Sequence, residues 1–374
     1  PPEFAGAVEA ASSTGGQIMP PIMGAAAFIM AEMTGYEYSD IIVRAILPAF
    51  LYFLGIFLGV HFKAKKLGLV GLKREELPKW KLLLPKIYLL LPLIILTWMV
   101  IAGQTMAKSA IYGTIVAIVV GIINKDDRMT PTKFVNGLEN GGKNCLSIGI
   151  ACGIAGIISV CITMTGLGGK LITYVVKLSN GHLFIALFLT MICCIILGMG
   201  VPTTANYIIM ASTCAPILIN GMGMHILAAN MFVFYFGIVA DITPPVALAA
   251  YAGAAIAKAP PMKTALNATR LAIAAFIIPY IFAYNNAMIF VGDVTFFGVA
   301  SIVISATLGM ASIASGFMGY LIHDLKWYSR IALIAGGLLM VIPGTVTDLS
   351  GLAILIVILL IQRAENKKEK KAAV

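Results

Sequence analysis

The chain has 374 residues, of which 60% are hydrophobic and only 11% are charged, and its formal net charge is +10 at pH 7. Soluble domains are about 45–50% apolar and about 25% charged, so this composition excludes an ordinary soluble protein and predicts an all-α polytopic membrane protein. The Lys and Arg residues form short clusters between apolar runs, which indicates membrane topology and argues against nucleic acid as a partner.

Apolar runs separated by charged, Gly or Pro residues predict the membrane passages. Three regions, 4–34, 183–219 and 225–258, are apolar but interrupted by polar breaks that contain Gly or Pro. The ordinary passages are expected near residues 41–61, 84–102, 107–123, 144–165, 264–290, 295–321, 331–345 and 349–362.

The positive charges fit one orientation of these passages. If 4–34 is a broken span and 183–219 is a re-entrant hairpin, only Arg44, Lys108, Lys170 and Lys177 fall on the outer side. The positive-inside rule then predicts a multi-pass protein of a bacterial or archaeal cytoplasmic membrane, with a cytoplasmic C-terminus. The inner side receives Lys63, Lys65, Lys66, Lys73, Arg74, Lys79, Lys81, Lys86, Lys125, Arg128, Lys133, Lys143, Lys258, Lys263, Arg270, Lys326, Arg330, Arg363, Lys367, Lys368, Lys370 and Lys371.

The same pattern predicts the domain organisation. Because the chain opens at Pro1 without an initiator Met, we expect an N-terminal part of the protein to lie upstream. The predicted segments are 1–34, the second part of a first transport repeat with a broken helix; 35–143, scaffold or arm helices; 144–258, a second transport repeat with the re-entrant hairpin 183–219 and the broken helix 225–258; 259–294, a scaffold helix; and 295–374, extra C-terminal helices with a basic cytoplasmic tail.

Two of the breaks are copies of each other. QIMPPIMGAA at 17–26 and DITPPVALAA at 241–250 share an Ile-x-Pro-Pro core and an Ala-Ala pair. The predicted topology inserts the copies in opposite directions, and such interrupted segments in inverted halves point to a transporter binding site near the midplane. Simple proline kinks are the alternative, since Pro and Gly are common in membrane helices; a repeated motif and a third break at 198–206 favour the site.

The breaks carry the chemistry expected of an ion site. Consecutive prolines end a helix and deprive upstream carbonyls of their partners, so we expect unpaired carbonyls there. Asp241, an ionisable residue within an apolar span, is a candidate by default. Carbonyls and hydroxyls suit a hard cation such as Na⁺, and the N-termini of the following half-helices suit an anionic substrate. The polar breaks supply Ser12, Ser13, Thr14, Gly15, Gly16, Gln17, Gly198, Gly200, Thr203, Thr204, Asn206, Asp241 and Thr243.

Three phrases identify a resemblance: PEFAGAVEAASSTGGQIMPPIMGAAAFIMAE, LGMGVPTTANYIIM and YFGIVADITPPVALAAYAGAAIA. They resemble the large permease subunit of tripartite ATP-independent periplasmic (TRAP) transporters, in particular the fused type paired with TAXI-type binding proteins, over about residues 1–290. The resemblance implies inverted repeats, an elevator mechanism, Na⁺-coupled uptake of small organic anions such as carboxylates, an extracytoplasmic solute-binding protein, and a small membrane subunit, often fused upstream.

The resemblance also implies site residues. Sodium regions would be Ser12 to Gly16, together with a first hairpin upstream of this sequence, and Gly198, Gly200, Thr203 and Thr204 with Ala240, Asp241 and Thr243. Substrate contacts are expected from Gln17, Pro20, Pro21, Asn206, Pro244 and Pro245. No cofactor is expected beyond Na⁺ as the coupling ion, and membrane lipids are the remaining expected partners.

The same residues bear on three other functions. An enzyme would require a polar constellation within the spans, but His61, His182, His225 and His323 lie near passage ends, so no enzymatic activity is expected. The six cysteines fit buried apolar positions better than a metal site. A channel would conduct without a delivered substrate, and a stand-alone Na⁺/dicarboxylate symporter would need no soluble partner.

Overall fold

The computed structural model describes residues 1–21, 23–71, 75, 77, 79–124, 126–292, 294–341 and 344–372. Three cations assigned to the inner side, Lys73, Arg74 and Lys125, lie outside this part, as do the side chains of Cys152 and of the lysines at 367, 368, 370 and 371.

The described chain is helical, and its only β-pairing is an isolated bridge between Tyr320 and Asp324. The elements in order are α1 (Pro2–Gly15), α2 (Ala25–Thr34), α3 (Tyr38–Lys66), α4 (Trp80–Leu83), η2 (Leu84–Leu90), α5 (Leu91–Ile101), α6 (Met106–Ile123), α7 (Pro131–Met164), α8 (Leu167–Ser179), α9 (Leu183–Gly198), α10 (Thr203–Thr213), η3 (Ile217–Gly221), α11 (Ile226–Ala240), α12 (Leu248–Ala257), α13 (Pro261–Leu271), α14 (Ile273–Tyr284), η4 (Asn286–Ile289), α15 (Phe296–Met318), α16 (Trp327–Leu339) and α17 (Thr345–Ala372).

Helices lie at all of the predicted passages, and the differences are in their ends. Helix α7 begins 13 residues before the expected 144, because the polar segment from Pro131 continues the helix and is supported by a Lys143–Glu139 ion pair one turn apart. Helix α8 lies in a segment for which no element was predicted. Within the described residues, five helical stretches are long and apolar enough to span a membrane: Tyr38–Lys66, Leu84–Ile101, Pro261–Tyr284, Phe296–Met318 and Val346–Glu365.

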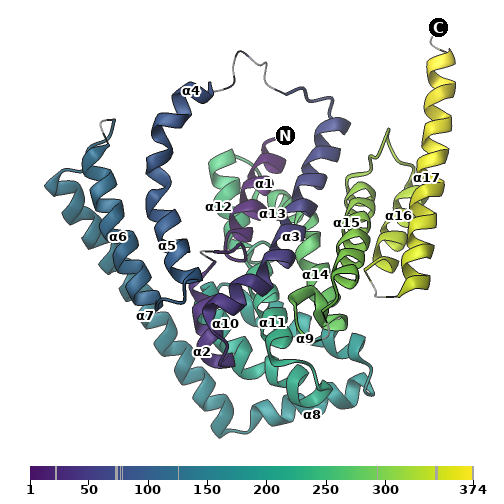
Figure 1. The fold of residues 1–374 in the computed structure, drawn as a ribbon. Coiled ribbons are helices and arrows are strands. Elements are labelled where there is room, and N and C mark those ends of the chain that lie inside the picture. The colour runs from purple at the N-terminus through teal and green to yellow at the C-terminus, as the bar shows by residue number, and fades with distance from the viewer. Residues whose placement is uncertain are drawn as a thin grey trace.

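Helix α11 forms the centre of the molecule. Every residue from Leu227 to Ala240 is buried, as expected for a helix that is apolar all round and is covered by other helices on each side. Helices α9, α10 and α14 pack directly against it. Helices α5, α6 and α7 lie to one side of this centre, and α15, α16 and α17 lie to the other (Figure 1).

The C-terminal helices attach to the rest of the chain through α15, which packs along α3. Small residues allow close approach within this group, as is common between membrane helices. A Cβ added at Gly309 would lie 3.0 Å from the carbonyl oxygen of Gly337, and the Ser312 hydroxyl donates to the Leu333 carbonyl across the same α15–α16 contact at 2.8 Å. Small residues on α15 therefore let α15 and α16 pack closely.

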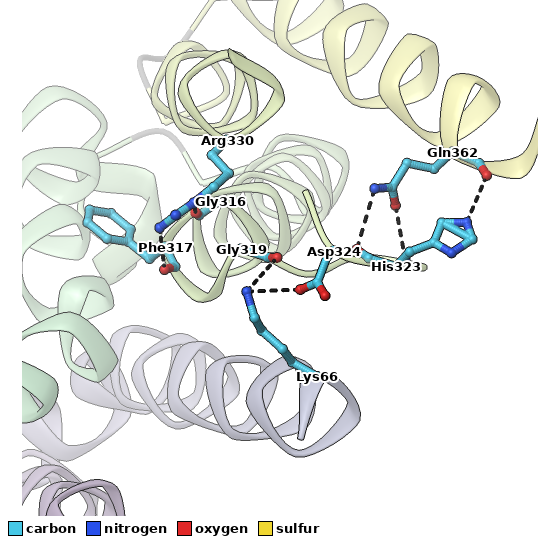
Figure 2. A network of polar contacts seen from close by, with 8 residues as sticks. All are labelled: Lys66, Gly316, Phe317, Gly319, His323, Asp324, Arg330 and Gln362. Carbon is cyan, nitrogen blue, oxygen red and sulfur yellow. Dashed lines mark hydrogen bonds and ion pairs between the residues drawn. The ribbon is translucent and has the colours of Figure 1, made fainter. Parts of the chain in front are cut away.

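A polar network ties this group to α3 at one end of the molecule (Figure 2). Lys66, at the end of α3, donates to the Gly319 carbonyl at 3.2 Å and pairs with Asp324 at 3.0 Å. Arg330 donates to the Gly316 and Phe317 carbonyls at the end of α15. The Gln362 side chain of α17 accepts from the backbone N–H of Ile322, in the segment between α15 and α16. At the opposite end of α3, Arg44 donates to the Phe290 carbonyl at 3.0 Å. The C-terminal group is therefore held at one end of α3 by the Lys66 contacts, and the segment between η4 and α15 is held at the other end by Arg44.

The closest approach between the two copies of the broken helix gives a stability prediction. A Cβ at Gly253 of α12 would lie 2.6 Å from the Gly6 carbonyl of α1, so Gly253→Ala forces the backbones apart. We expect it to cost about 1–3 kcal/mol of stability and to lower the midpoint of thermal unfolding in detergent. Gly142→Ala on α7, where the added Cβ meets open space, serves as the control and should leave the midpoint unchanged or slightly raised. Equal midpoints for the two variants would contradict the α1–α12 contact.

Candidate functional site

Both predicted broken helices are interrupted where the Pro-Pro motifs lie. Helix α1 ends at Gly15 and α2 begins at Ala25, while α11 ends at Ala240 and α12 begins at Leu248. At 1.5 Å per residue, these four half-helices are about 15–22 Å long, which is shorter than the roughly 30 Å of a hydrocarbon core. Each interruption therefore falls within the apolar region of its span.

The two breaks have the same local structure. Backbone N–H groups of Gln17, Ile18 and Met23 donate to residues 14, 15 and 19, and the residues 224 positions later, Asp241, Ile242 and Ala247, donate to 238, 239 and 243. Both Pro-Pro bonds are cis, and Met23 and Ala247 both have positive φ. The carbonyls of Pro21 and Pro245 each accept a tyrosine hydroxyl, from Tyr38 and Tyr251 respectively. The sequence repeat is thus also a structural repeat.

These bonds correct one expectation about the breaks. The carbonyls at the end of each first half-helix were expected to be unpaired, but Ser13, Thr14 and Gly15 all accept backbone N–H groups, as do Ile238 and Val239 in the second copy. The physical reason is that the helix end tightens, so that donors two or three residues beyond the last turn reach back to these oxygens. The Gly15 carbonyl also accepts from Met19, and the Val239 carbonyl also accepts the Thr243 hydroxyl, so both lone pairs of these two oxygens are engaged. The carbonyls of Ser13, Thr14 and Ile238 each keep one lone pair that can still contribute to an ion site.

Each half of one broken helix packs against the opposite half of the other. Helix α1 lies against α12, and α2 lies against α11, so the first half of each copy meets the second half of the other. This is the arrangement expected of two copies that run in opposite directions. From the Gly6–Gly253 contact, α1 continues about 13 Å to its break and α12 about 7 Å back to its own, so both breaks lie on the same side of that contact.

The third break lies against the second. A Cβ at Gly198, at the end of α9, would lie 2.8 Å from the Ala240 Cβ and 2.6 Å from the Asn206 amide nitrogen. Gly200 has a φ of 76° and faces Val246. The Asn206 amide donates to the carbonyl of Gly237 on α11 at 3.1 Å. The structure therefore brings the tip between α9 and α10 to the end of α11.

The residues predicted around the first break have different neighbours. Gly15 packs directly against the Tyr52 ring of α3, and the Tyr52 hydroxyl donates to the Ala11 carbonyl at 2.7 Å. The Ser13 hydroxyl bonds Glu9 on the same helix. Thr14 is buried, whereas Ser12 is half-buried and Gly16 is exposed. This first group thus borders α3. The second group, which comprises the predicted residues of the α9–α10 tip and of the break after α11, borders α9 and α10.

The possible ligands in the second group are mainly oxygen atoms. Thr203 and Thr204 begin α10, and Asp241 ends α11; all three are half-buried. The Thr243 hydroxyl donates to the Val239 carbonyl, and the Asp241 carbonyl accepts from Ala249. In the part of the chain that is described, no cluster of three or more His, Cys, Asp or Glu residues could hold a metal ion. The available ligands are the hydroxyls, carbonyls and single carboxylate that suit an alkali cation.

The predicted substrate residues divide in the same way. Gln17, Pro20 and Pro21 follow α1, and the Gln17 carbonyl accepts from Gly24 at 2.9 Å, which closes that loop. Pro244 and Pro245 lie in the corresponding loop of the second copy, and Pro245 is exposed. Asn206 is fully buried, and its side-chain oxygen has no hydrogen-bond partner.

Several buried polar residues near the second group were not predicted from the sequence. The Tyr207 hydroxyl donates to the Asn230 side chain at 2.8 Å, joining α10 to α11, and the Thr190 and Tyr235 hydroxyls are buried without a partner. The available signal was the presence of Asn230 in the otherwise apolar run 226–240, since polar residues within a span are costly unless paired or functional.

A family comparison agrees with this geometry. The model of the family described as "Tripartite ATP-independent periplasmic transporter, DctM component" matches residues 1–297, which include all three breaks. The chain belongs to the DctM family. A search of curated proteins finds no match.

DctM membership confirms the resemblance seen in the three motifs and makes the chain the multi-pass membrane permease of a TRAP transporter. It also implies that this DctM chain works with a solute-binding protein and a small membrane subunit. The family is one of transporter components. The matched region ends at the start of α15, so most of the C-terminal group lies beyond it.

The buried pair between α10 and α11 can be tested by stability. Tyr207→Phe removes the hydroxyl and leaves the Asn230 oxygen buried without its donor, which costs about 1–3 kcal/mol. We expect a lower midpoint of thermal unfolding for the purified DctM chain. Tyr174→Phe, at an exposed position on α8, is the matched control and should leave the midpoint unchanged. A Tyr207→Phe midpoint equal to that of the parent would contradict the pair.

Proposed function

We propose that this DctM chain takes up small organic anions, such as carboxylates, by Na⁺-coupled symport with an elevator mechanism. One observation carries the proposal. Two broken helices pack with the first half of each against the second half of the other, their two breaks have the same local structure, and the α9–α10 tip lies against the second break. Interrupted helices of this kind hold substrate and coupling ions in secondary transporters.

The cation would be held at two groups of oxygens. The first comprises the region from Ser12 to Gly16, in which the carbonyls of Ser13 and Thr14 each accept one backbone N–H group and keep a lone pair. The second comprises Thr203 and Thr204 at the start of α10 with the region from Ala240 to Thr243. Asp241 supplies the only full negative charge of the second group, so it offsets the charge of a bound Na⁺. No other cofactor is proposed.

An anionic substrate would face the starts of the second half-helices. Helices α2, α10 and α12 all begin at a break, and none of the three has a side-chain N-cap hydrogen bond. In the first turns, the N–H groups of Ala27 and Ala249 donate to the Gly24 and Asp241 carbonyls. The remaining N–H groups at these starts, and the positive dipole ends, are available to a carboxylate. The proposed substrate contacts, Gln17, Pro20, Pro21, Asn206, Pro244 and Pro245, belong to or adjoin the three breaks.

In this mechanism the helices around the breaks move against a scaffold that includes α3. The proposed membrane is a bacterial or archaeal cytoplasmic membrane, with the basic ends of α3 and α17 on the cytoplasmic side as the positive-inside rule requires. A TAXI-type solute-binding protein would deliver the substrate from outside, and the small membrane subunit would be fused upstream. The proposed divisions are transport repeats at 1–34 and 144–258, and scaffold or additional helices at 35–143, 259–294 and 295–374.

The cation site is tested by uptake into proteoliposomes that contain the complete transporter. Asp241→Asn, and separately Thr203→Ala with Thr204→Ala, should raise the Na⁺ concentration for half-maximal uptake about tenfold or more, the factor expected when a charge-assisted contact is lost. Thr173→Ala on α8, whose hydroxyl bonds its own helix, is the control. If the variants keep the parent's Na⁺ dependence, these residues do not bind the coupling ion.

The requirement for a binding protein separates the proposed transporter from its rivals. Under one inward Na⁺ gradient, we expect substrate uptake only when the neighbouring solute-binding protein is added. The measurement is the initial uptake rate of labelled carboxylate, with and without that protein. Equal rates in both conditions would instead identify a stand-alone symporter, and substrate flux without any Na⁺ gradient would identify a channel.

A further inference from the structure

Two cavities adjoin one another beside α15, away from the three breaks. The first has a volume of about 370 Å³ and lies between α15 and the start of α17. The second, of about 260 Å³, extends toward the end of α14. Both are lined by Ser301, Ser305, Met340 and Asp348, so these four side chains form the wall that the cavities share.

The first cavity follows one face of α15. Its lining residues on that helix, at 297, 300, 301, 304, 305 and 308, recur with the spacing of a single helical face and span about 16 Å along the axis. Leu349 and Leu352 of α17 form the opposite wall. Phe297, Ile304 and Leu349 are each more than half exposed, so the groove opens on the surface that meets lipid. An apolar groove of this length fits an acyl chain.

The second cavity is more polar. Besides the shared serines and Asp348, its lining includes Asn285, next to the last turn of α14, and the backbone of Gly344 before α17. Ser305 donates to the Asp348 carboxylate at 2.6 Å, which fixes one carboxylate oxygen at the wall between the two cavities. A polar pocket that continues into an apolar groove fits the head and chain of an amphiphile.

Asp348 determines the charge of that head. It is the only charged side chain among the described residues that line either cavity. None of the ion pairs formed by the described residues includes it, although Asp348 lies in the apolar span Val346–Glu365. An aspartate in the first turn also stabilises the helix dipole, but that role requires neither cavity. A protonated amine would neutralise the carboxylate and donate hydrogen bonds to it.

We propose that the groove between α15 and α17 is a binding site for an aminophospholipid, with the primary ammonium of its head at Asp348 and one acyl chain along α15. The site lies at the end of α15 opposite the Lys66–Asp324 pair, which places it in the outer leaflet under the proposed topology. The binding itself does not depend on the transported substrate or on Na⁺ coupling, so this proposal and the proposed function can fail separately.

The test measures retained lipid on the purified full chain by native mass spectrometry. The probes are phosphatidylethanolamine, phosphatidylcholine and phosphatidylglycerol with identical acyl chains. We expect phosphatidylethanolamine to bind most tightly, because its ammonium donates hydrogen bonds that the quaternary ammonium of phosphatidylcholine cannot donate. Asp348→Asn should lower the affinity for phosphatidylethanolamine about tenfold and leave the affinity for phosphatidylglycerol unchanged.

Two further variants make the test decisive. Asp40→Asn removes a carboxylate from the first turn of α3, which is an equivalent helix position away from either cavity, and it should leave the lipid preference unchanged. Ala300→Phe fills the groove while Asp348 stays intact, and it should reduce phosphatidylethanolamine binding. Equal affinity of the parent for all three lipids, an equal loss for every lipid in Asp348→Asn, or parental lipid binding by Ala300→Phe would each overturn the proposal.

Discussion

The requirement that every backbone polar group within a bilayer find a partner governs this structure. Consecutive prolines at 20–21 and 244–245 remove donors in the middle of two spans, so the chain must satisfy the adjacent groups in another way. In both copies the helix end tightens and a tyrosine hydroxyl reaches the carbonyl of the second proline, from Tyr38 of α3 in the first copy and from Tyr251 of α12 in the second. The breaks are therefore built features with a defined fold. They leave available one lone pair on the carbonyls of Ser13, Thr14 and Ile238, and starts of the next half-helices that no side chain caps.

This constraint explains the position of α11. A helix that ends within the membrane at Asp241 must have its end enclosed by protein, and α11 is buried along its whole length by α9, α10 and α14. The glycine at 198 permits the α9–α10 tip to approach Ala240 closely, and Asn206 then bonds α11 directly. The α9–α10 tip thus covers the end of α11, and Thr203 and Thr204 begin the helix that follows it.

Much of this could be predicted from the sequence, since membrane spans and Pro-Pro breaks depend on local composition. The helix positions, the repeat at 17–26 and 241–250, and the third break at 198–206 all follow from residues close together in the chain. Partners far apart in the sequence could not be predicted in this way. The Tyr52 contact with Gly15 and the Tyr207–Asn230 bond depend on how helices pack, and α8 lacks the long apolar run by which the spans were found. The state of the carbonyls was predicted wrongly, because a proline pair reports which donors are lost but not which donors replace them.

The C-terminal group shows how an addition can be joined to a transporter without disturbing its site. Its helices meet the remainder of the chain mainly along α3, on the opposite side of the molecule from α5, α6 and α7 (Figure 1). The exposed Lys66–Asp324 pair contributes little by itself, as is usual for such pairs. Its position is more informative than its strength: it joins the end of α3 to the turn after α15, and α15 itself packs along α3. A motion that leaves α3 in place therefore also leaves the C-terminal group in place. Under the proposed elevator mechanism, a groove on α15 would then keep its depth in the membrane while the helices around the breaks change theirs.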